Sequence, residues 1–344
     1  MTSLLAALEA LGRSDWSPAR DEMWTLPSYH VDGLHPEAAR QLRRVLAGLA
    51  RGDRAVGAVL RGPPGSGKTH LLSWLREQIQ ADGGFFVVLS PAGDHVADIL
   101  DGLQRRAPGG GNQLGRLLGV LADRAGLDGA TRAAVTGRGR LARSHLDTLA
   151  AAVRPADLGE TALALALIAS PGPESAAGRD FLAGSAGPAA WGLGAARPRP
   201  EVLRDLLRLL ALGGPVVLAV DDLVPEARDQ IAVMLAEAGS RTLIVVACRD
   251  TWPLPAGPSR FAMLPELGTI PDPAIAAAIV GARFRPRYAA MTFAPPYPTW
   301  PVTAAALDEA AHHYTARRLL LRVHDHIAAC VAAGTVAELT TLAA

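Results

Sequence analysis

The chain has 344 residues, of which 49% are apolar and only 5% aromatic, and its formal net charge is +1. This balance excludes a strong general attraction to nucleic acid or to an anionic membrane. Two cysteines provide no disulfide framework, which is typical of a reducing compartment. The longest apolar run is too short to span a bilayer, and Met1 to Ala10 lacks the pattern of an export signal. We therefore expect a cytoplasmic protein without membrane contact.

A glycine-rich loop follows the first predicted strand. Glu37 to Ala50 has a helical pattern, Ala55 to Leu60 reads as a short buried strand, and Leu71 to Ile79 reads as an amphipathic helix. Between this strand and this helix lies a complete match to the phosphate-binding loop pattern. The matching residues are Gly62, Pro63, Pro64, Gly65, Ser66, Gly67, Lys68 and Thr69.

The residue types of this loop suit a nucleoside triphosphate, most simply ATP with Mg²⁺. Glycines allow backbone amides to turn toward phosphates, and the start of the following helix adds its dipole. Lys68 is the only lysine in a chain with 33 arginines, and a compact ammonium can reach the β- and γ-phosphates where a planar guanidinium cannot. The Thr69 hydroxyl should bind Mg²⁺. His70, the next residue, is included among the expected nucleotide-binding residues.

A long stretch without a convincing strand separates the second predicted strand, Phe85 to Leu89, from the third. Such a stretch must contain structure of its own, so we predict an inserted helical subdomain. Its helical patterns are Val96 to Arg106, Leu114 to Ala125, Leu141 to Val153 and Thr161 to Ala169. Ser170 to Pro200, with repeated Pro and Gly, is predicted to be a flexible return linker.

The predicted insertion contains an arginine cluster, formed by Arg132, Arg138, Arg140 and Arg143 with glycines between them. The cluster could contact nucleic acid phosphates. No aromatic residue is interleaved to stack a base, and the net charge is near zero. These two observations favour a solvated face over a nucleic acid site.

The third predicted strand, Pro215 to Val220, is a near-continuous apolar run, as expected for a parallel strand covered on both faces. It leads directly into Asp221 and Asp222, in the pattern of a Walker B motif. Asp221 would hold Mg²⁺, and Asp222 would act as the base toward the attacking water. Because Asp is one methylene shorter than Glu, slow hydrolysis or a base elsewhere stays open, as does a simple polar turn.

The fourth predicted strand, Thr242 to Ala247, follows a predicted helix at Pro225 to Ala238 and ends at Cys248 and Arg249. In ATPase families with an extra strand between the two motif strands, this strand tip carries a polar sensor of the γ-phosphate. Arg249 is the candidate sensor. The alternative is an arginine that pairs with Asp250 or Asp222.

With these residues assembled, the chain resembles the AAA+ and STAND branches of P-loop ATPases over residues 29–101 and 201–330. The segments LAVDDL and VVACRD are similar to STAND nucleotide switches. The segment around Arg260 is similar to the one that carries the arginine finger in AAA+ proteins of the origin-recognition and helicase-loader kind. The run from Tyr314 to Arg318 is similar to a sensor-2 motif. The layout also resembles ATPase subunits of bacterial antiviral defence systems.

The resemblance implies roles for several residues. Arg260 would complete the site of a neighbouring subunit, and Arg317 or Arg318 would close a helical lid onto the phosphates. For each of these arginines, a solvated surface position is the alternative. The entry segment from Tyr29 to Pro36 would line the adenine pocket, with Val31 and Gly33 as base contacts or as an ordinary helix lead-in.

The C-terminal part is predicted to be helical at Ala274 to Val280 and at Leu307 to Ala333, which together would form the lid. Four histidines lie there, His312, His313, His324 and His326, but no ligand pair has the spacing of a helical zinc site. We interpret them as solvated or structural. Phe293 to Pro301 is predicted to be an exposed aromatic loop suited to a partner contact.

The sequence thus predicts a three-layer α/β P-loop NTPase core with a parallel sheet, a long helical insertion and a C-terminal helical lid. We expect an N-terminal segment (1–28), a first core part (29–101), the insertion with its linker (102–200), a second core part (201–273) and the lid (274–344). The expected function is an ATPase that works in a homo-oligomer or a partner complex, with DNA or phage defence as contexts. The alternative is a slowly hydrolysing nucleotide switch. A small-molecule kinase is disfavoured by the distance between the motifs.

Overall fold

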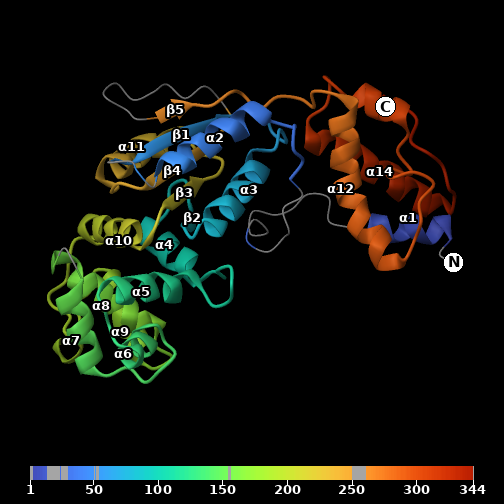
Figure 1. Ribbon diagram of the computed structural model, residues 1–344. Helices are drawn as coiled ribbons and strands as arrows, with labels where there is room; N and C mark the ends of the chain where they lie inside the picture. Colours follow the sequence, from blue (N-terminus) through green and yellow to red (C-terminus); the bar gives the residue numbers. More distant parts are fainter. Residues whose placement is uncertain are drawn as a thin grey trace.

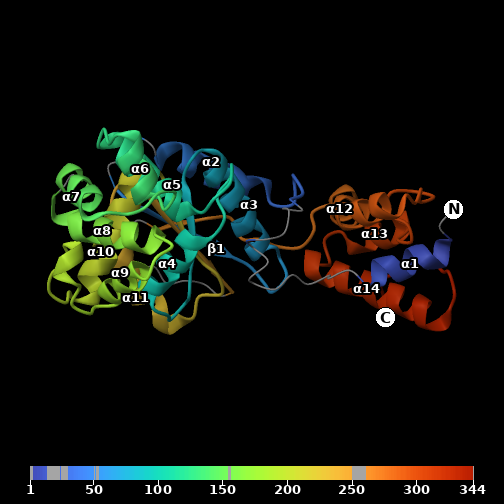
Figure 2. The ribbon, with the colours of Figure 1, turned by 90° about the horizontal axis from the view of Figure 1, so that it is seen from below.

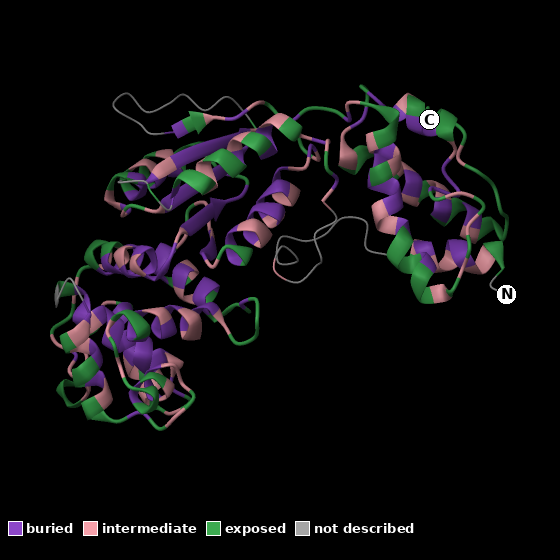
Figure 3. Cartoon of the chain, viewed as in Figure 1, coloured by how far each residue is buried: buried purple, intermediate pink, exposed green. Residues whose placement is uncertain are grey.

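A parallel β-sheet with helices on both faces forms the centre of the molecule, and a separate group of helices follows it (Figure 1). The computed structural model describes residues 3–13, 24, 30–49, 51, 54–153, 156–249 and 261–343. Figure 3 shows that most strand residues outside β5 are buried, whereas the outward sides of the helices are exposed. Among the described helices, none combines the length and the apolarity that crossing a membrane would need.

The described sheet has the strand order β2-β3-β4-β1-β5, and every described strand pair is parallel. The strands are β1 (Val56–Arg61), β2 (Phe85–Leu89), β3 (Val216–Val220), β4 (Thr242–Cys248) and β5 (Phe261–Met263). The four predicted strands are therefore confirmed to within a residue at each end, and β5 is an addition. Strand β4 lies between β1 and β3, as expected for a core with an extra strand between the two motif strands. Apolar side chains fill these strands because helices cover both faces.

The helices form two layers around the sheet (Figure 2). On one face, α2 (Pro36–Leu49) and α3 (Lys68–Ala81) pack their buried side chains, such as Leu42 and Leu72, against Leu243 of β4. The other face is covered by α4 (His95–Gln104), α10 (Arg199–Gly213) and α11 (Arg228–Glu237), which begins after a 3₁₀ turn at Pro225–Ala227. This is a three-layer α/β P-loop fold, and the predicted fold class is confirmed.

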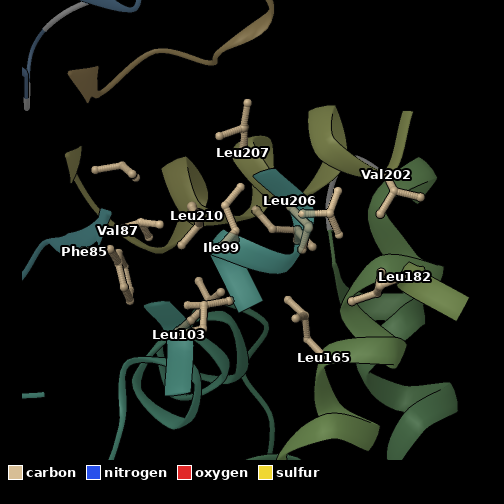
Figure 4. Packing of buried hydrophobic residues seen from close by; sticks show 14 of the residues in the cluster. Phe85, Val87, Ile99, Leu103, Leu165, Leu182, Val202, Leu206, Leu207 and Leu210 are labelled. Atoms are coloured by element: carbon tan, nitrogen blue, oxygen red, sulfur yellow. The ribbon is translucent and has the colours of Figure 1, made fainter. Parts of the chain in front are cut away.

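The predicted helical insertion is also present between α4 and α10. It contains α5 (Gln113–Arg124), α6 (Gly129–Val135), α7 (Arg143–Ala152), α8 (Gly159–Ala169) and α9 (Glu174–Leu182), with 3₁₀ turns at Ala156–Leu158 and Ala189–Trp191. Its hydrophobic core is continuous with that of the sheet, as Figure 4 shows for Phe85 of β2, Leu103 of α4, Leu165 of α8 and Leu182 of α9. The insertion and the sheet face therefore share one core.

A buried glutamine ties the insertion to an edge strand. The side chain of Gln113, at the start of α5, accepts a hydrogen bond from the Phe86 amide (2.9 Å) and donates one to the Phe86 carbonyl (2.8 Å). The same amide group also donates to the Gly102 carbonyl (2.8 Å). These bonds pair the buried N–H and C=O groups of Phe86 on the edge strand and the buried C=O group of Gly102 near the end of α4.

The prediction of a flexible linker at Ser170 to Pro200 is wrong. The stretch contains α9, whose Phe181 and Leu182 are fully buried against α8. The close approach depends on Gly178, because a Cβ there would lie 2.5 Å from the Ala164 carbonyl oxygen. At least one glycine of the predicted linker is therefore a helix-packing residue.

The C-terminal lid is a helical group that also includes the first helix of the chain. It consists of α12 (Pro273–Met291), α13 (Ala304–Ala310) and α14 (Ala316–Ala333), and α1 (Leu4–Gly12) lies beside α14 in Figure 1. Leu8 and Leu11 of α1 are fully buried in the same cluster as Val280 of α12 and Val323 of α14. Both ends of the chain thus contribute to the lid core.

Two local predictions for the lid fail. The helix expected from Leu307 to Ala333 is two helices, separated by a turn in which His312 has a φ of +66°. The loop from Phe293 to Pro301 is not an exposed aromatic segment, because Trp300 is only 2% exposed. The Tyr288 hydroxyl of α12 donates to the Trp300 carbonyl, and the Phe293 ring packs against that of Trp300 with centroids 5.7 Å apart. Packing against α12 removes these rings from solvent.

Replacement of Leu11 by Ala should lower the stability of the lid by about 2–5 kcal/mol, because Leu11 is fully buried between α1 and the C-terminal helices. Hydrogen exchange measured by helix should show the loss of protection in α12 and α14. Leu4→Ala on the same helix is the control, since Leu4 is 42% exposed and its truncation should cost about 0.5 kcal/mol or less. Unchanged exchange of α14 in Leu11→Ala would contradict the assignment of α1 to the lid.

Candidate functional site

The phosphate loop has a backbone that only glycine accommodates at three positions. Gly62, Gly65 and Gly67 have φ angles of +154°, +80° and +104°. A Cβ on Gly62 would lie 2.2 Å from the Leu267 carbonyl oxygen, and a Cβ on Gly65 would lie 2.6 Å from the Cβ of Arg317. The glycines of the motif therefore serve both the turn and the close approach of neighbouring chain segments.

Lys68 begins α3 and is only 8% exposed. Its Nζ donates to the carbonyls of Gly62 (2.6 Å) and Pro63 (3.0 Å), so the side chain lies along its own loop. Burial lowers the pKa of the ammonium, and the carboxylates of Asp221 and Asp222 oppose this shift. The ammonium is thus held at the loop by two carbonyls and by two nearby negative charges.

The predicted metal-binding pair meets at one edge of the sheet. Thr69 lies in the first turn of α3, and Asp221 follows β3. The Thr69 hydroxyl donates to Oδ2 of Asp221 over 2.7 Å, although the two residues are 152 positions apart in the chain. The carboxyl ends of parallel strands meet at the same edge, which is where α/β proteins bind ligands. Asp221 is only 8% exposed, so little bulk water screens this carboxylate.

The candidate base and the candidate sensor pair with each other. Asp222 accepts from Arg249 through both carboxylate oxygens, with Nε–Oδ1 and Nη2–Oδ2 distances of 3.1 Å. Both side chains are about 60% exposed. Asp222 also has a φ of +55°, a left-handed conformation that aspartate tolerates better than most residues. Of the alternatives for Arg249, pairing with Asp222 is the one in the structure, and Asp250 lies outside the described residues.

The lid contacts the phosphate loop through the start of α14. The Arg317 amide donates to the Gly65 carbonyl (3.2 Å), and the Arg317 side chain packs where a Gly65 Cβ would be. The guanidinium of Arg318 instead lies over the Tyr314 ring, 4.5 Å from its centroid. Of the two candidate sensor-2 arginines, Arg317 is the one beside the loop. The candidate finger, Arg260, lies outside the described residues.

The entry segment before α2 joins the lid to the core. Val31 is 9% exposed and belongs to the lid cluster, and a Cβ on Gly33 would lie 2.8 Å from the Ile275 Cδ1 of α12. His35 bonds through Nε2 to the carbonyl of Ser66 in the phosphate loop (2.6 Å). The segment therefore runs between α12 and the loop.

A stack of rings lies next to the loop and includes His70. The His70 ring is parallel to that of His30 with centroids 5.6 Å apart, and His30 stacks on Trp74 at 5.2 Å. The Arg43 guanidinium lies over the Trp74 ring, 5.1 Å from its centroid. Of these residues, only His70 was predicted from the sequence as part of the site. The spacing of His70 and Trp74, one helical turn apart, is a signal that could have indicated a shared ring face.

Burial sets the protonation of the histidine stack. It lowers the pKa of His70 to about 4, with help from His30 and Arg283, and it lowers the pKa values of His30 and His35 as well. At neutral pH these rings are therefore neutral. Their tautomers follow from the contacts that each ring makes.

The residues at the loop fit a nucleotide phosphate with Mg²⁺. The backbone N–H groups of Gly67, Lys68 and Thr69 donate no hydrogen bond to any described residue, and they lie at the start of a helix. The Ser66 hydroxyl is buried and has no partner in the described part of the chain. Thr69 and Asp221 offer the hydroxyl and carboxylate oxygens that Mg²⁺ prefers.

Comparison with known proteins finds distant structural similarities. No protein-family model matches the chain, and no curated protein sequence matches it. It is similar to the structure of Cdc6p from Pyrobaculum aerophilum, with 14% identity, a TM-score of 0.42 and coverage of 92% of this chain and 67% of that chain. It is also similar to a Walker-type ATPase of Pyrococcus abyssi, with 12% identity, a TM-score of 0.34 and coverage of 85% and 67%.

The position of β4 between β1 and β3 and the phosphate loop between β1 and α3 agree with the expectations drawn from the sequence. The roles of individual residues rest on the contacts described above.

Acidification should destabilise the protein through His70. Its pKa is about 4 in the folded state and about 6.5 in an unfolded chain. The unfolded state therefore binds more protons between these values, and stability falls as the pH drops through this window. The loss from His70 alone approaches about 3 kcal/mol near pH 4. Urea unfolding from about pH 7 to about pH 5 should show this decline.

His70→Phe is the matched control for this experiment, because it keeps a ring against His30 without a titrating nitrogen. Its stability should fall less steeply with acidification than that of the wild type. His30 and His35 would account for the dependence that remains. Identical pH profiles for the variant and the wild type would contradict a buried neutral His70.

Proposed function

We propose that this protein is an ATPase that couples ATP binding and hydrolysis to a conformational change in a homo-oligomer or a partner complex. The observation that carries this proposal is the hydrogen bond from Thr69 to Asp221 beside Lys68. It joins the two halves of the expected Mg²⁺-nucleotide site at one edge of the sheet.

Each residue of the site has a distinct proposed role. Backbone N–H groups at the start of α3 would bind phosphate oxygens, and Lys68 would leave its loop carbonyls to contact the β- and γ-phosphates. Thr69 and Asp221 would hold the metal, directly or through water. Bound Mg²⁺ would supply neutralisation of the charge that develops on the phosphate oxygens.

Asp222 is the proposed base. Its carboxylate would accept the proton of the attacking water, and it follows directly after the metal-holding Asp221. To do so it must part from Arg249, which occupies both of its oxygens. Because both groups are exposed, the cost of separating them is small, on the order of 1 kcal/mol or less. A phosphate group that attracts Arg249 would favour the separation.

The lid is the part of the protein that we propose moves when nucleotide binds. Arg317 contacts Gly65 through its backbone N–H and its Cβ. A shift of the phosphate loop on nucleotide binding would therefore displace the start of α14. The entry segment provides a second contact, since Gly33 packs against α12 while His35 bonds to the loop. Closure of the lid on a nucleotide would therefore move α12, α14 and α1 together, because they share one core.

The resemblance to AAA+ proteins supports an oligomer in which Arg260 completes the site of a neighbouring subunit. Cytoplasmic work on DNA or in phage defence is proposed on the same family resemblance alone.

A second candidate function is a switch that binds nucleotide tightly and hydrolyses it slowly. The Asp222–Arg249 pair favours it, because an engaged base is not available to a water molecule. The short side chain of Asp222 also favours slow hydrolysis, because Asp reaches less far toward a water molecule than Glu does. In this case the lid would report which nucleotide is bound, and turnover would only reset the signal.

Steady-state ATP hydrolysis across protein concentration, with and without DNA, tests the proposal. Turnover per chain should rise with concentration as neighbouring subunits complete each other's sites. Lys68→Ala should abolish it by removing phosphate binding. Asp222→Asn should reduce it about 100-fold or more while ATP still binds, because only the proton acceptor is lost.

The outcomes separate the two candidates. Tight ATP binding that Lys68→Ala destroys, with negligible turnover at every concentration, would replace the ATPase by the switch. The variant Arg249→Ala then tests the role of Arg249. A fall in turnover at unchanged ATP affinity supports a sensor. A rise in turnover indicates that Arg249 restrains Asp222, the proposed base. Wild-type protein that binds no ATP would overturn both candidates.

A further inference from the structure

The arginine cluster of the insertion divides into two pairs with different surroundings. Arg132 pairs with Asp123 (2.9 Å), and Arg143 pairs with Asp147 (2.7 Å) while donating to the carbonyls of Ala189 and Ala190. These two arginines hold elements of the insertion together. Arg138 and Arg140, by contrast, are exposed and have no ion-pair partner among the described residues.

Arg138 and Arg140 line a cleft of about 360 Å³ at the surface of the insertion. One wall is the turn between α6 and α7, from Gly137 to Leu141, and the other is the turn between α8 and α9, from Ser170 to Glu174. The walls touch at Gly137, where a Cβ would lie 2.2 Å from the Ala169 carbonyl oxygen. In Figure 1 the insertion lies below the sheet and the lid to its right, and in both views α6 to α9 lie well away from the lid (Figures 1 and 2).

The first wall also offers backbone groups. Among the described residues, no partner accepts a hydrogen bond from the N–H groups of Gly139, Arg140 and Leu141, and none donates to their carbonyls. These backbone donors and acceptors, in a segment without regular structure, can form hydrogen bonds with a peptide backbone. The wall therefore offers two arginine side chains and unpaired backbone groups together.

The opposite wall carries a fixed negative charge. The Ser170 hydroxyl is buried and donates to the Glu174 carboxylate, which lowers the pKa of Glu174. A continuous phosphate backbone would meet this carboxylate at close range, and no aromatic ring lines the cleft to stack a base. A peptide suits the cleft better, because it alternates backbone donors and acceptors and can direct one acidic side chain to the arginines while its N–H groups face Glu174.

We propose that this cleft binds an extended acidic peptide segment of a partner protein. A carboxylate of the peptide binds Arg138 and Arg140, its backbone hydrogen-bonds to the unpaired backbone groups of residues 139–141, and Glu174 accepts a hydrogen bond from the peptide. The site is independent of the nucleotide chemistry, and it provides a place for a partner on the face of the molecule that the lid does not occupy.

Fluorescence anisotropy of the full-length protein with a labelled peptide of alternating glutamate and glycine tests the proposal. The double variant Arg138→Glu/Arg140→Glu should weaken binding about tenfold or more, since it removes two charge-assisted contacts and adds repulsion. Arg124→Glu/Arg179→Glu is the charge-matched control, because both arginines are exposed on the insertion outside the cleft lining, and it should bind as the wild type does. Circular dichroism confirms that each variant is folded.

The variant Glu174→Gln should have the opposite effect on peptide affinity. Its amide oxygen can still accept from Ser170, but the negative charge is gone, so affinity for the acidic peptide should rise about two- to fivefold. Equal losses in the cleft and control variants would show attraction by net charge only and overturn the proposal. Absence of peptide binding would overturn it too, as would tighter binding of a labelled single-stranded DNA that the cleft variant abolishes.

Discussion

The hydrogen bond between Thr69 and Asp221 is the contact on which the functional arrangement depends. It can form only if the loop after β1 and the end of β3 lie at the same edge of the sheet, with β4 between their strands. Parallel pairing ensures this, since it brings all carboxyl ends to one side. The same edge then holds Asp222 and Arg249, because their strands are neighbours in the sheet.

The two helical additions meet this core in different ways. The lid contacts it through a few residues at the phosphate loop, chiefly Arg317 on Gly65, and through the entry segment. The insertion shares a hydrophobic core with one face of the sheet, and Gln113 fastens it to β2. A sparse contact allows movement, whereas a shared core resists it. The lid is therefore suited to respond to nucleotide, and the insertion is suited to present a surface in a fixed orientation.

Much of the core and part of the site could be predicted from the sequence because their signals are local. The buried strands are continuous apolar runs, and the phosphate loop and Asp221 follow such runs directly. The fold class and the meeting of Thr69 with Asp221 are both in the structure. The catalytic and binding roles of individual residues, including Asp222, Arg249 and Arg317, stay predictions.

The failures involve contacts between distant segments. The repeated Pro and Gly of Ser170 to Pro200 indicated a linker, yet Gly178 within it lets α9 pack closely on α8. The aromatic residues after Phe293 have no apolar periodicity of their own, but α12 provides a surface that buries Trp300. Likewise, the burial of α1 against α14 and the ring stack of His30 on Trp74 bring together segments that local pattern cannot connect. Short strand β5, with only three residues, carries too little pattern to be seen.

The most direct test of the central claim is the Mg²⁺ dependence of ATP affinity in a double-mutant cycle of Thr69→Val and Asp221→Asn, measured by calorimetric titration. If the two side chains hold one metal, each change should remove the Mg²⁺-dependent part of the affinity. The double variant should then bind ATP no more weakly than the weaker of the two single variants. This corresponds to a coupling of about tenfold or more between the two side chains. An ATP affinity that ignores Mg²⁺, or losses that simply add, would contradict a shared Mg²⁺-nucleotide site.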